Sequence, residues 1–407
     1  MPAWSDHPAY RSLITGFMGK INWARSQWGI LARSPFRRKV AIEFPPRLTL
    51  NASISLRSPD AILCRFHIGT AFALTDLFMQ IAATSDINNS GTPDDYLVAE
   101  QRHERDRFTD YGWLPEVAAA TPLPVCPQVC PRDKLRLALG EQLIDLAILF
   151  IVLHEEAHYA CGHLHLLQQL GLDPQLAEQP TEQMASSVAA GSSTFDLRKR
   201  LELEADSAAI ISILMSAQDH HVLRTSHLGS RMTSSVWQDL AVLAACTLCC
   251  QFELSGRRRN VRSAASTHPC AGCRTLNLLQ AVRQYHIASH GAEPGPDALR
   301  GHLENLSILS VLLDAAPVDM SDLMSGFYKG CPPVPDSPGA EYVRLVDTAE
   351  GEGSKFREMR DKALRMAGIL EPQALNRRSP KGTPVDIVMN IPVSFADLRS
   401  EGKRGSR

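Results

Sequence analysis

The chain has 407 residues, of which 44% are hydrophobic and 21% are charged, and its formal net charge is −2. A chain of this length is expected to fold as two or three structural units with a real core, and its composition excludes wholesale disorder. The near-zero net charge excludes attraction of the whole surface to nucleic acid or anionic membranes. The basic stretches Arg257–Arg259 and Lys403–Arg407 are interpreted as a solvated loop and a frayed terminus.

The first residues, MPAWSDHPAY, do not have the basic start and apolar stretch of a secretory signal. We therefore expect the protein to stay in the cytoplasm. The longest apolar runs, residues 146–153 and 240–250, are shorter than the roughly 18 residues that span a bilayer, which favours buried helices and no membrane contact. In this setting the ten cysteines are expected to be reduced thiols or metal ligands.

The N-terminal third is expected to contain a small β element. Residues 48–56 place apolar side chains at every second position, which is the period of a half-buried strand. The segment Lys39–Phe44 is interpreted as its hairpin partner across Pro45 and Pro46. A helical pattern follows over Cys64–Ala83.

Residues 85–134 are rich in Pro, Asp, Asn and Gly and are interpreted as a surface excursion with one short helix near Asp94–Arg107. The rest of the chain is mainly helical. The expected helices cover residues 133–169, 193–217, 234–252, 274–289 and 297–315, with a loop at 171–193 and a Pro/Gly-rich stretch at 330–339. The pattern predicts an α+β fold with an N-terminal mixed region (1–130), a helical core (131–290) and a C-terminal helical region with a flexible tail (291–407).

The main chemical motif is HEEAH at residues 154–158, inside a helix whose preceding turns are apolar. Imidazoles four residues apart, His154 and His158, lie on one helix face about 6 Å apart and can bind a single zinc ion. Glu155 comes off the side of that face, where it can reach a water without becoming a ligand. Burying these groups is costly unless they are paired or coordinated, and a metal satisfies all three.

A second motif, ELEAD at residues 202–206, follows 44 residues after His158 on the next predicted helix. Glu202 and Asp206 are one turn apart and share a face, whereas Glu204 points away from both. Glu202 completes a His2Glu ligand set with a fourth position open to water. Asp206 can accept the free N–H of a ligand histidine and fix its tautomer.

These residues resemble the gluzincin metallopeptidases, and ELEAD in particular resembles the HtpX and CAAX-prenyl endopeptidase branch. Thr267-His268-Pro269, followed by Arg274, is similar to the His-Pro element and Arg of that branch. The resemblance covers about residues 145–285. It implies a zincin-like core, and it makes His268 or Arg274 the candidate donor to the oxyanion. Because that branch is often membrane-embedded, a second resemblance is drawn to the small Lit-type phage-exclusion peptidases, which are cytoplasmic HExxH proteins.

The motifs lead to a hypothesis of zinc-dependent peptide hydrolysis with Glu155 as general base, acting on a protein or peptide substrate. A substrate strand is placed, as a guess, against the edge formed by residues 48–56. The metzincin pattern HExxHxxGxxH is excluded because Cys161 and Leu164 occupy its Gly and last His positions. A catalytically silent relative that keeps the zinc scaffold stays open as an alternative.

Four cysteines provide a different interpretation. Cys246 and Cys249 are separated by 20 residues from Cys270 and Cys273, which is close to a zinc-ribbon pattern. Zinc at these thiols would indicate an interaction module, or a nucleic-acid-binding module with Arg257–Arg262 between the pairs. However, Cys246 and Cys249 lie in an apolar helical run, which favours buried thiols that pack as small hydrophobes. The number of subunits, the substrate and the role of residues 300–407 are not legible in the sequence.

Overall fold

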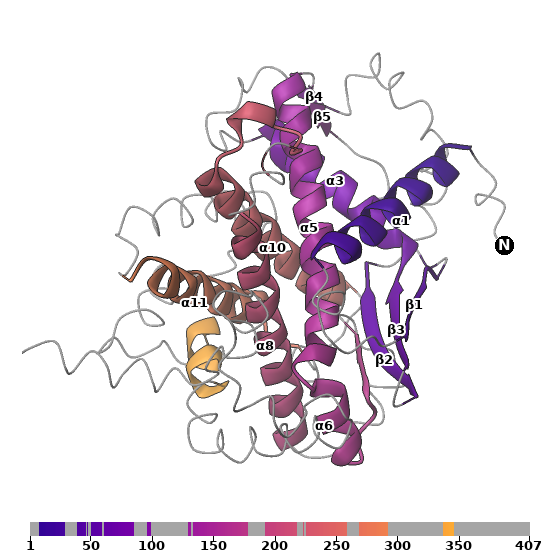
Figure 1. The fold of residues 1–407 in the computed structure, drawn as a ribbon, viewed down its shortest axis with the longest axis vertical. Helices are drawn as coiled ribbons and strands as arrows, with labels where there is room; N and C mark the ends of the chain where they lie inside the picture. Colours follow the sequence, from indigo (N-terminus) through magenta and orange to yellow (C-terminus); the bar gives the residue numbers. More distant parts are fainter. Residues whose placement is uncertain are drawn as a thin grey trace, which may run out of the picture.

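The structure is a computed structural model. It describes residues 8–28, 39–45, 47, 50–58, 61–84, 96–98, 129–131, 133–177, 192–217, 223, 225–258, 268–291 and 337–345. These residues form a mainly helical α+β fold with a small sheet near the N-terminus (Figure 1), as the sequence predicts. The expected helix at 297–315 lies outside the described residues. The proposed division into three regions stays a prediction.

The sheet has four strands in the order β1-β3-β2-β6, with β1 at Lys39–Glu43, β2 at Ala52–Ser58, β3 at Ala61–Phe66 and β6 at Gln175–Ala177. The prediction of a hairpin between β1 and the next strand was wrong, because β1 pairs in parallel with β3. The hairpin forms instead between β2 and β3. The start of the expected helix at Cys64 was also wrong. Cys64 lies in β3, where it is buried together with Ile62 and Leu63, and the helix begins at Ile68.

The small strand β6 lies within the segment expected to be a loop, and it pairs with β2 over Ser53–Ser55. This pairing places β2 inside the sheet, so the guess that it forms an open edge was wrong. Within the described residues, β1 and β6 are the two outer strands. Two further short strands, β4 (Tyr96–Val98) and β5 (Val129–Pro131), pair with each other. The strand β4 replaces the beginning of the helix expected near Asp94.

The centre of the fold is α5 (Lys134–Ala160), which runs through the molecule with the sheet on one side and α10 and α11 on the other (Figure 1). Asp133 caps its N-terminus, accepting hydrogen bonds from the backbone N–H groups of Leu135 and Arg136, each at 2.9 Å. Two helices, α1 (Pro8–Trp28), absent from the sequence predictions, and α3 (Ile68–Thr84), pack against α5. The helix is covered on several sides, and every residue from Leu146 to Tyr159 is buried.

The helix ends earlier than the sequence analysis expected. A single helix over 133–169 was wrong, because the chain breaks after Ala160 and resumes as α6 (His163–Gln169). Gly162 lies between them with φ of 79°, a conformation that a side chain disfavours and that glycine adopts readily. The break redirects the residues that follow it.

The remaining long helices confirm the predictions to within a few residues, except that the helix expected at 234–252 extends to Arg258. They are α8 (Ser192–Ser216), α10 (Ser234–Arg258) and α11 (Ala271–His290), with a short 3-10 helix η5 at Gly229–Arg231 before α10. Both α8 and α10 pack on α5, and α11 packs on α8 and α10. A further short helix covers residues 338–345. One apolar cluster joins these elements, from Phe17 in α1 to Leu345.

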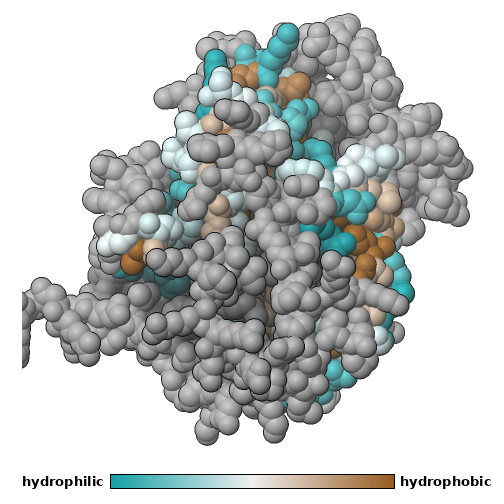
Figure 2. All heavy atoms as spheres, viewed as in Figure 1, coloured by the Kyte–Doolittle hydropathy of each residue, from teal (hydrophilic) through white to brown (hydrophobic). Residues whose placement is uncertain are grey.

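Two helices, α5 and the Ser234–Glu253 part of α10, are long and apolar enough to cross a membrane by length and composition alone. The sequence analysis, which counted only uninterrupted apolar runs, expected no stretch of that length. In each helix, 78% of the most apolar window is buried inside the protein. Figure 2 shows hydrophilic and hydrophobic surface interleaved among the described residues of one face. The absence of membrane contact stays a prediction.

Candidate metal centre

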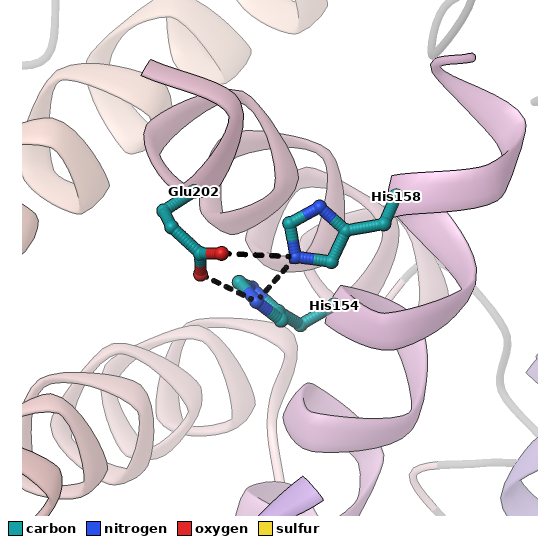
Figure 3. A group of neighbouring side chains, drawn as sticks. All are labelled: His154, His158 and Glu202. Carbon is teal, nitrogen blue, oxygen red and sulfur yellow. Dashed lines mark hydrogen bonds and ion pairs between the residues drawn. The ribbon is translucent and has the colours of Figure 1, made fainter. Parts of the chain in front are cut away.

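The two histidines of the HEEAH motif lie in the last turns of α5, opposite Glu202 on α8 (Figure 3). His154 Nε2 is 3.0 Å from His158 Nε2 and 3.2 Å from Glu202 Oε2. His158 Nε2 is 3.6 Å from Glu202 Oε1. The packing of α8 on α5 therefore brings together three residues that the sequence analysis assigned to one metal ion.

The donor atoms fit a tetrahedral ion. With nitrogen and oxygen ligands at about 2.0–2.1 Å, a tetrahedral zinc holds its ligand atoms about 3.3–3.4 Å apart. The three observed separations, 3.0, 3.2 and 3.6 Å, lie around that value. Two imidazoles and one carboxylate are also the ligand set of several catalytic zinc sites. The group can therefore hold one metal ion.

All three side chains are buried, each with a relative exposure of 1%. Burial, followed by the neighbouring imidazoles and Arg274, lowers the pKa of His158 well below its usual range. His158 is therefore neutral at pH 7. A neutral imidazole has the free electron pair that a metal ion requires.

The ring nitrogen of His154 that faces away from Glu202 lies beside Asp206, and Asp206 in turn is bound by Arg274. His154 Nδ1 lies 2.9 Å from Asp206 Oδ1, so the ring can donate to this carboxylate and leave Nε2 facing Glu202. Arg274 binds both oxygens of Asp206, through Nε at 2.8 Å and Nη2 at 2.7 Å. Burial raises the pKa of Asp206, but Arg274 and His154 outweigh it and the pKa is lowered. The contact anticipated for Asp206 is present.

The family resemblance placed His268 and Arg274 near the cleft, and both lie close to Glu202 or its neighbours. His268 Nε2 is 3.4 Å from Glu202 Oε2, and the side chain is 10% exposed. Arg274, in the first turn of α11, is 2% exposed and is held by Asp206. Of the two candidates for the oxyanion donor, His268 is the more exposed, and the role itself stays a prediction.

The two adjacent glutamates of the motif have different surroundings. Glu156 accepts a hydrogen bond from Arg25 of α1, Nε to Oε1 at 2.9 Å, although it is only 1% exposed. Glu155 is equally buried. Burial and then the charges of Glu156 and Glu155 raise the pKa of Cys64 on β3. Glu156 is thus held by an arginine of α1, and the role of Glu155 as general base stays a prediction.

Three residues that the sequence analysis assigned no role lie beside the first group. His163 Nδ1 is 2.9 Å from His158 Nδ1, and His163 Nε2 is 3.2 Å from Glu204 Oε2. Cys161, His163 and Glu204 offer a second set of ligand atoms within 4.8 Å of one another. The Glu204 carboxylate therefore lies beside His163. The glycine at position 162 was the signal for the turn that brings His163 back.

The four cysteines of the ribbon pattern do not form a comparable set. Cys246, Cys249 and Cys273 are buried in α10 and α11, and Cys270 caps α11 by accepting a hydrogen bond from the backbone N–H of Cys273. Burial raises the thiol pKa of Cys246, Cys270 and Cys273. Within the described part of the chain, the two groups that can hold a metal contain none of these four. The structure does not favour the ribbon interpretation.

Comparison with known proteins adds one finding. No curated protein and no solved structure matches the chain. Residues 115–291 match the model of the family Peptidase U49, a Lit-type peptidase family, and this range contains every candidate residue described above. The similarity to the HtpX branch is not confirmed. Over residues 115–291 the chain is therefore similar to the Peptidase U49 family, which supports a metallopeptidase-like protein that acts on proteins or peptides.

Proposed function

We propose that the protein is a zinc-dependent endopeptidase of the gluzincin type. The observation that supports this most strongly is the convergence of His154 Nε2, His158 Nε2 and the Glu202 carboxylate, with separations of 3.0–3.6 Å. The match to a peptidase family over the same residues supports it independently. His154, His158 and Glu202 would hold the ion.

When bound, a zinc ion acidifies water and polarises a carbonyl oxygen. In the proposed reaction, Glu155 takes a proton from the attacking water as the water oxygen bonds to the peptide carbon. The carbon–nitrogen bond then breaks, and Glu155 returns the proton to the leaving amine. His268, close to Glu202, is the proposed donor to the oxyanion. Arg274 acts through Asp206 and positions His154.

The test compares two adjacent glutamates. We expect Glu155→Gln to keep one zinc ion per chain and to reduce peptide hydrolysis by about 10²–10⁴-fold, because the amide cannot accept the proton. Glu156→Gln is the matched control, since Glu156 is equally buried but contacts Arg25. It should keep both zinc and activity. Cleavage of a peptide library, followed by mass spectrometry with and without a chelator, measures the loss. Full activity in Glu155→Gln would reject Glu155 as the base.

We also propose that the protein works in the cytoplasm without membrane contact. The burial of 78% of the apolar windows in α5 and α10 supports this, because buried side chains are not exposed to lipid. Fractionation of cells, followed by carbonate extraction of the membranes, tests the proposal. Protein that stays in the extracted membrane pellet would contradict it.

A further inference from the structure

Each candidate histidine ligand has a second ring nitrogen, and the structure gives that nitrogen a buried partner in both cases. For His154 the partner is Asp206, at 2.9 Å from Nδ1. For His158 it is His163, also at 2.9 Å from Nδ1. His163 is fully buried, and its own Nε2 lies 3.2 Å from Glu204 Oε2. Two chains of contacts therefore lead outward from the metal centre.

The direction of the hydrogen bonds in the second chain follows from the metal site. If His158 uses Nε2 as a ligand and is neutral, its proton must be on Nδ1. That proton points at His163 Nδ1, which must then accept and carry no proton. A neutral His163 consequently has its proton on Nε2, which donates to the Glu204 carboxylate. One arrangement of protons satisfies His158, His163 and Glu204 together.

We propose that His163 and Glu204 form a positioning relay that fixes the tautomer and ring orientation of His158, as Asp206 and Arg274 do for His154. The inference rests on the proposed metal centre. Outer partners of this kind hold a ligand ring in place and increase its basicity, and their loss typically weakens metal binding 10–100-fold. Glu204, which the ELEAD motif places two residues after Glu202, would thus support the second ligand of the site.

The same proton arrangement excludes a second metal ion at Cys161, His163 and Glu204 while the first site is filled. A metal ion bound there would take the electron pair of His163 Nε2, the nitrogen beside Glu204. The proton of His163 would then move to Nδ1. Two N–H groups, on His158 and His163, would face each other at a nitrogen separation of 2.9 Å. The protein is therefore expected to bind one ion, although two groups of ligand atoms exist.

The turn at Gly162 makes this relay possible. Because Gly162 adopts φ of 79°, α5 ends and His163 returns towards the ring of His158 rather than continuing along the helix axis. In a continued helix each residue adds about 100°, so position 163 would lie about 140° round the axis from His158 and on another face. A five-residue spacing between the two histidines therefore works only with this break.

The experiment is a double-mutant cycle on zinc affinity, measured by competition with a chromogenic chelator. His163→Leu is expected to weaken zinc binding 10–100-fold, and Glu204→Ala should also weaken it. In the double variant, the loss should equal that of His163→Leu alone, because Glu204 acts through His163. His163→Asn, which offers an oxygen acceptor to His158, should recover part of the affinity. His227→Leu is the control. It removes another histidine–carboxylate contact, in which His227 Nε2 lies 2.9 Å from Asp145 in the middle of α5.

The outcomes separate this inference from the proposed function. A wild-type protein that binds no zinc would reject the metal centre itself. One zinc per chain, with unchanged affinity in both His163→Leu and Glu204→Ala, would keep the metal centre and overturn the relay. Additive losses would show that the two residues act independently, which also overturns it. Two zinc ions per wild-type chain, one of them lost in Cys161→Ser, would contradict the exclusion. Because Glu204 is 11% exposed, Glu204→Ala stays informative if His163→Leu folds poorly.

Discussion

Two regions of this molecule have the sequence pattern of a zinc site, and the structure treats them differently. The histidine region joins α5 and α8 and gathers His154, His158 and Glu202 into one group. The cysteine region joins α10 and α11, where Cys246, Cys249 and Cys273 are buried in the apolar core. Both depend on two segments that are distant in sequence, so spacing alone does not distinguish them.

The two regions differ in whether their buried ionisable groups have partners of opposite charge. In the histidine region, buried acidic groups have cationic or imidazole partners, such as Arg274 for Asp206 and Arg25 for Glu156. In the cysteine region, burial raises the pKa of Cys246 and Cys273, and the thiols stay neutral. The two regions thus differ in whether donor atoms from distant segments converge and in whether the buried charges have partners.

The largest effect on stability is expected from breaking the charge network of the histidine region. Arg274→Ala leaves the Asp206 carboxylate buried without the guanidinium that binds both its oxygens. We expect unfolding to become easier by about 3–5 kcal/mol, measured by denaturant titration. The double variant Asp206→Asn/Arg274→Met should recover part of this loss because it removes both charges. A loss below about 1 kcal/mol in Arg274→Ala would show that the network does not support the fold.

A smaller effect is expected in the cysteine region. Cys246→Ala removes one buried sulfur atom and should lower the free energy of unfolding by about 1 kcal/mol, with zinc content unchanged. Loss of one equivalent of zinc in this variant would contradict the conclusion that the cysteine region does not bind the metal. Elemental analysis and denaturant titration of the same preparation make both measurements.

A pH dependence is expected in α10, at a distance from both regions in function. Burial raises the pKa of Asp239 from 3.8 to about 6. The folded protein therefore holds this proton more tightly than the unfolded chain, and stability falls as pH rises from about 4 to about 6. We expect Asp239→Asn to match the wild-type melting temperature at pH 4 and to exceed it at pH 7.5. Equal melting temperatures at both pH values would show that this carboxyl is not strained by burial.

The helices and the shared face of His154 and His158 were predictable because their signals are local. Helices α8 and α11 follow apolar periodicity, and an i, i+4 pair of histidines needs only one regular helix. The parallel pairing of β1 with β3 was not predictable from the strands themselves, since alternation shows a strand but not its partner. The contact between His158 and His163 depends on one positive φ at Gly162, which the apolar pattern on either side concealed.

Zinc content in paired variants tests the central claim most directly. We predict one zinc ion per wild-type chain, none in His158→Ala, and one in Cys273→Ala, each measured by elemental analysis after dialysis against a weak chelator. A zinc ion that survives in His158→Ala but is lost in Cys273→Ala would contradict the assignment of the metal to His154, His158 and Glu202.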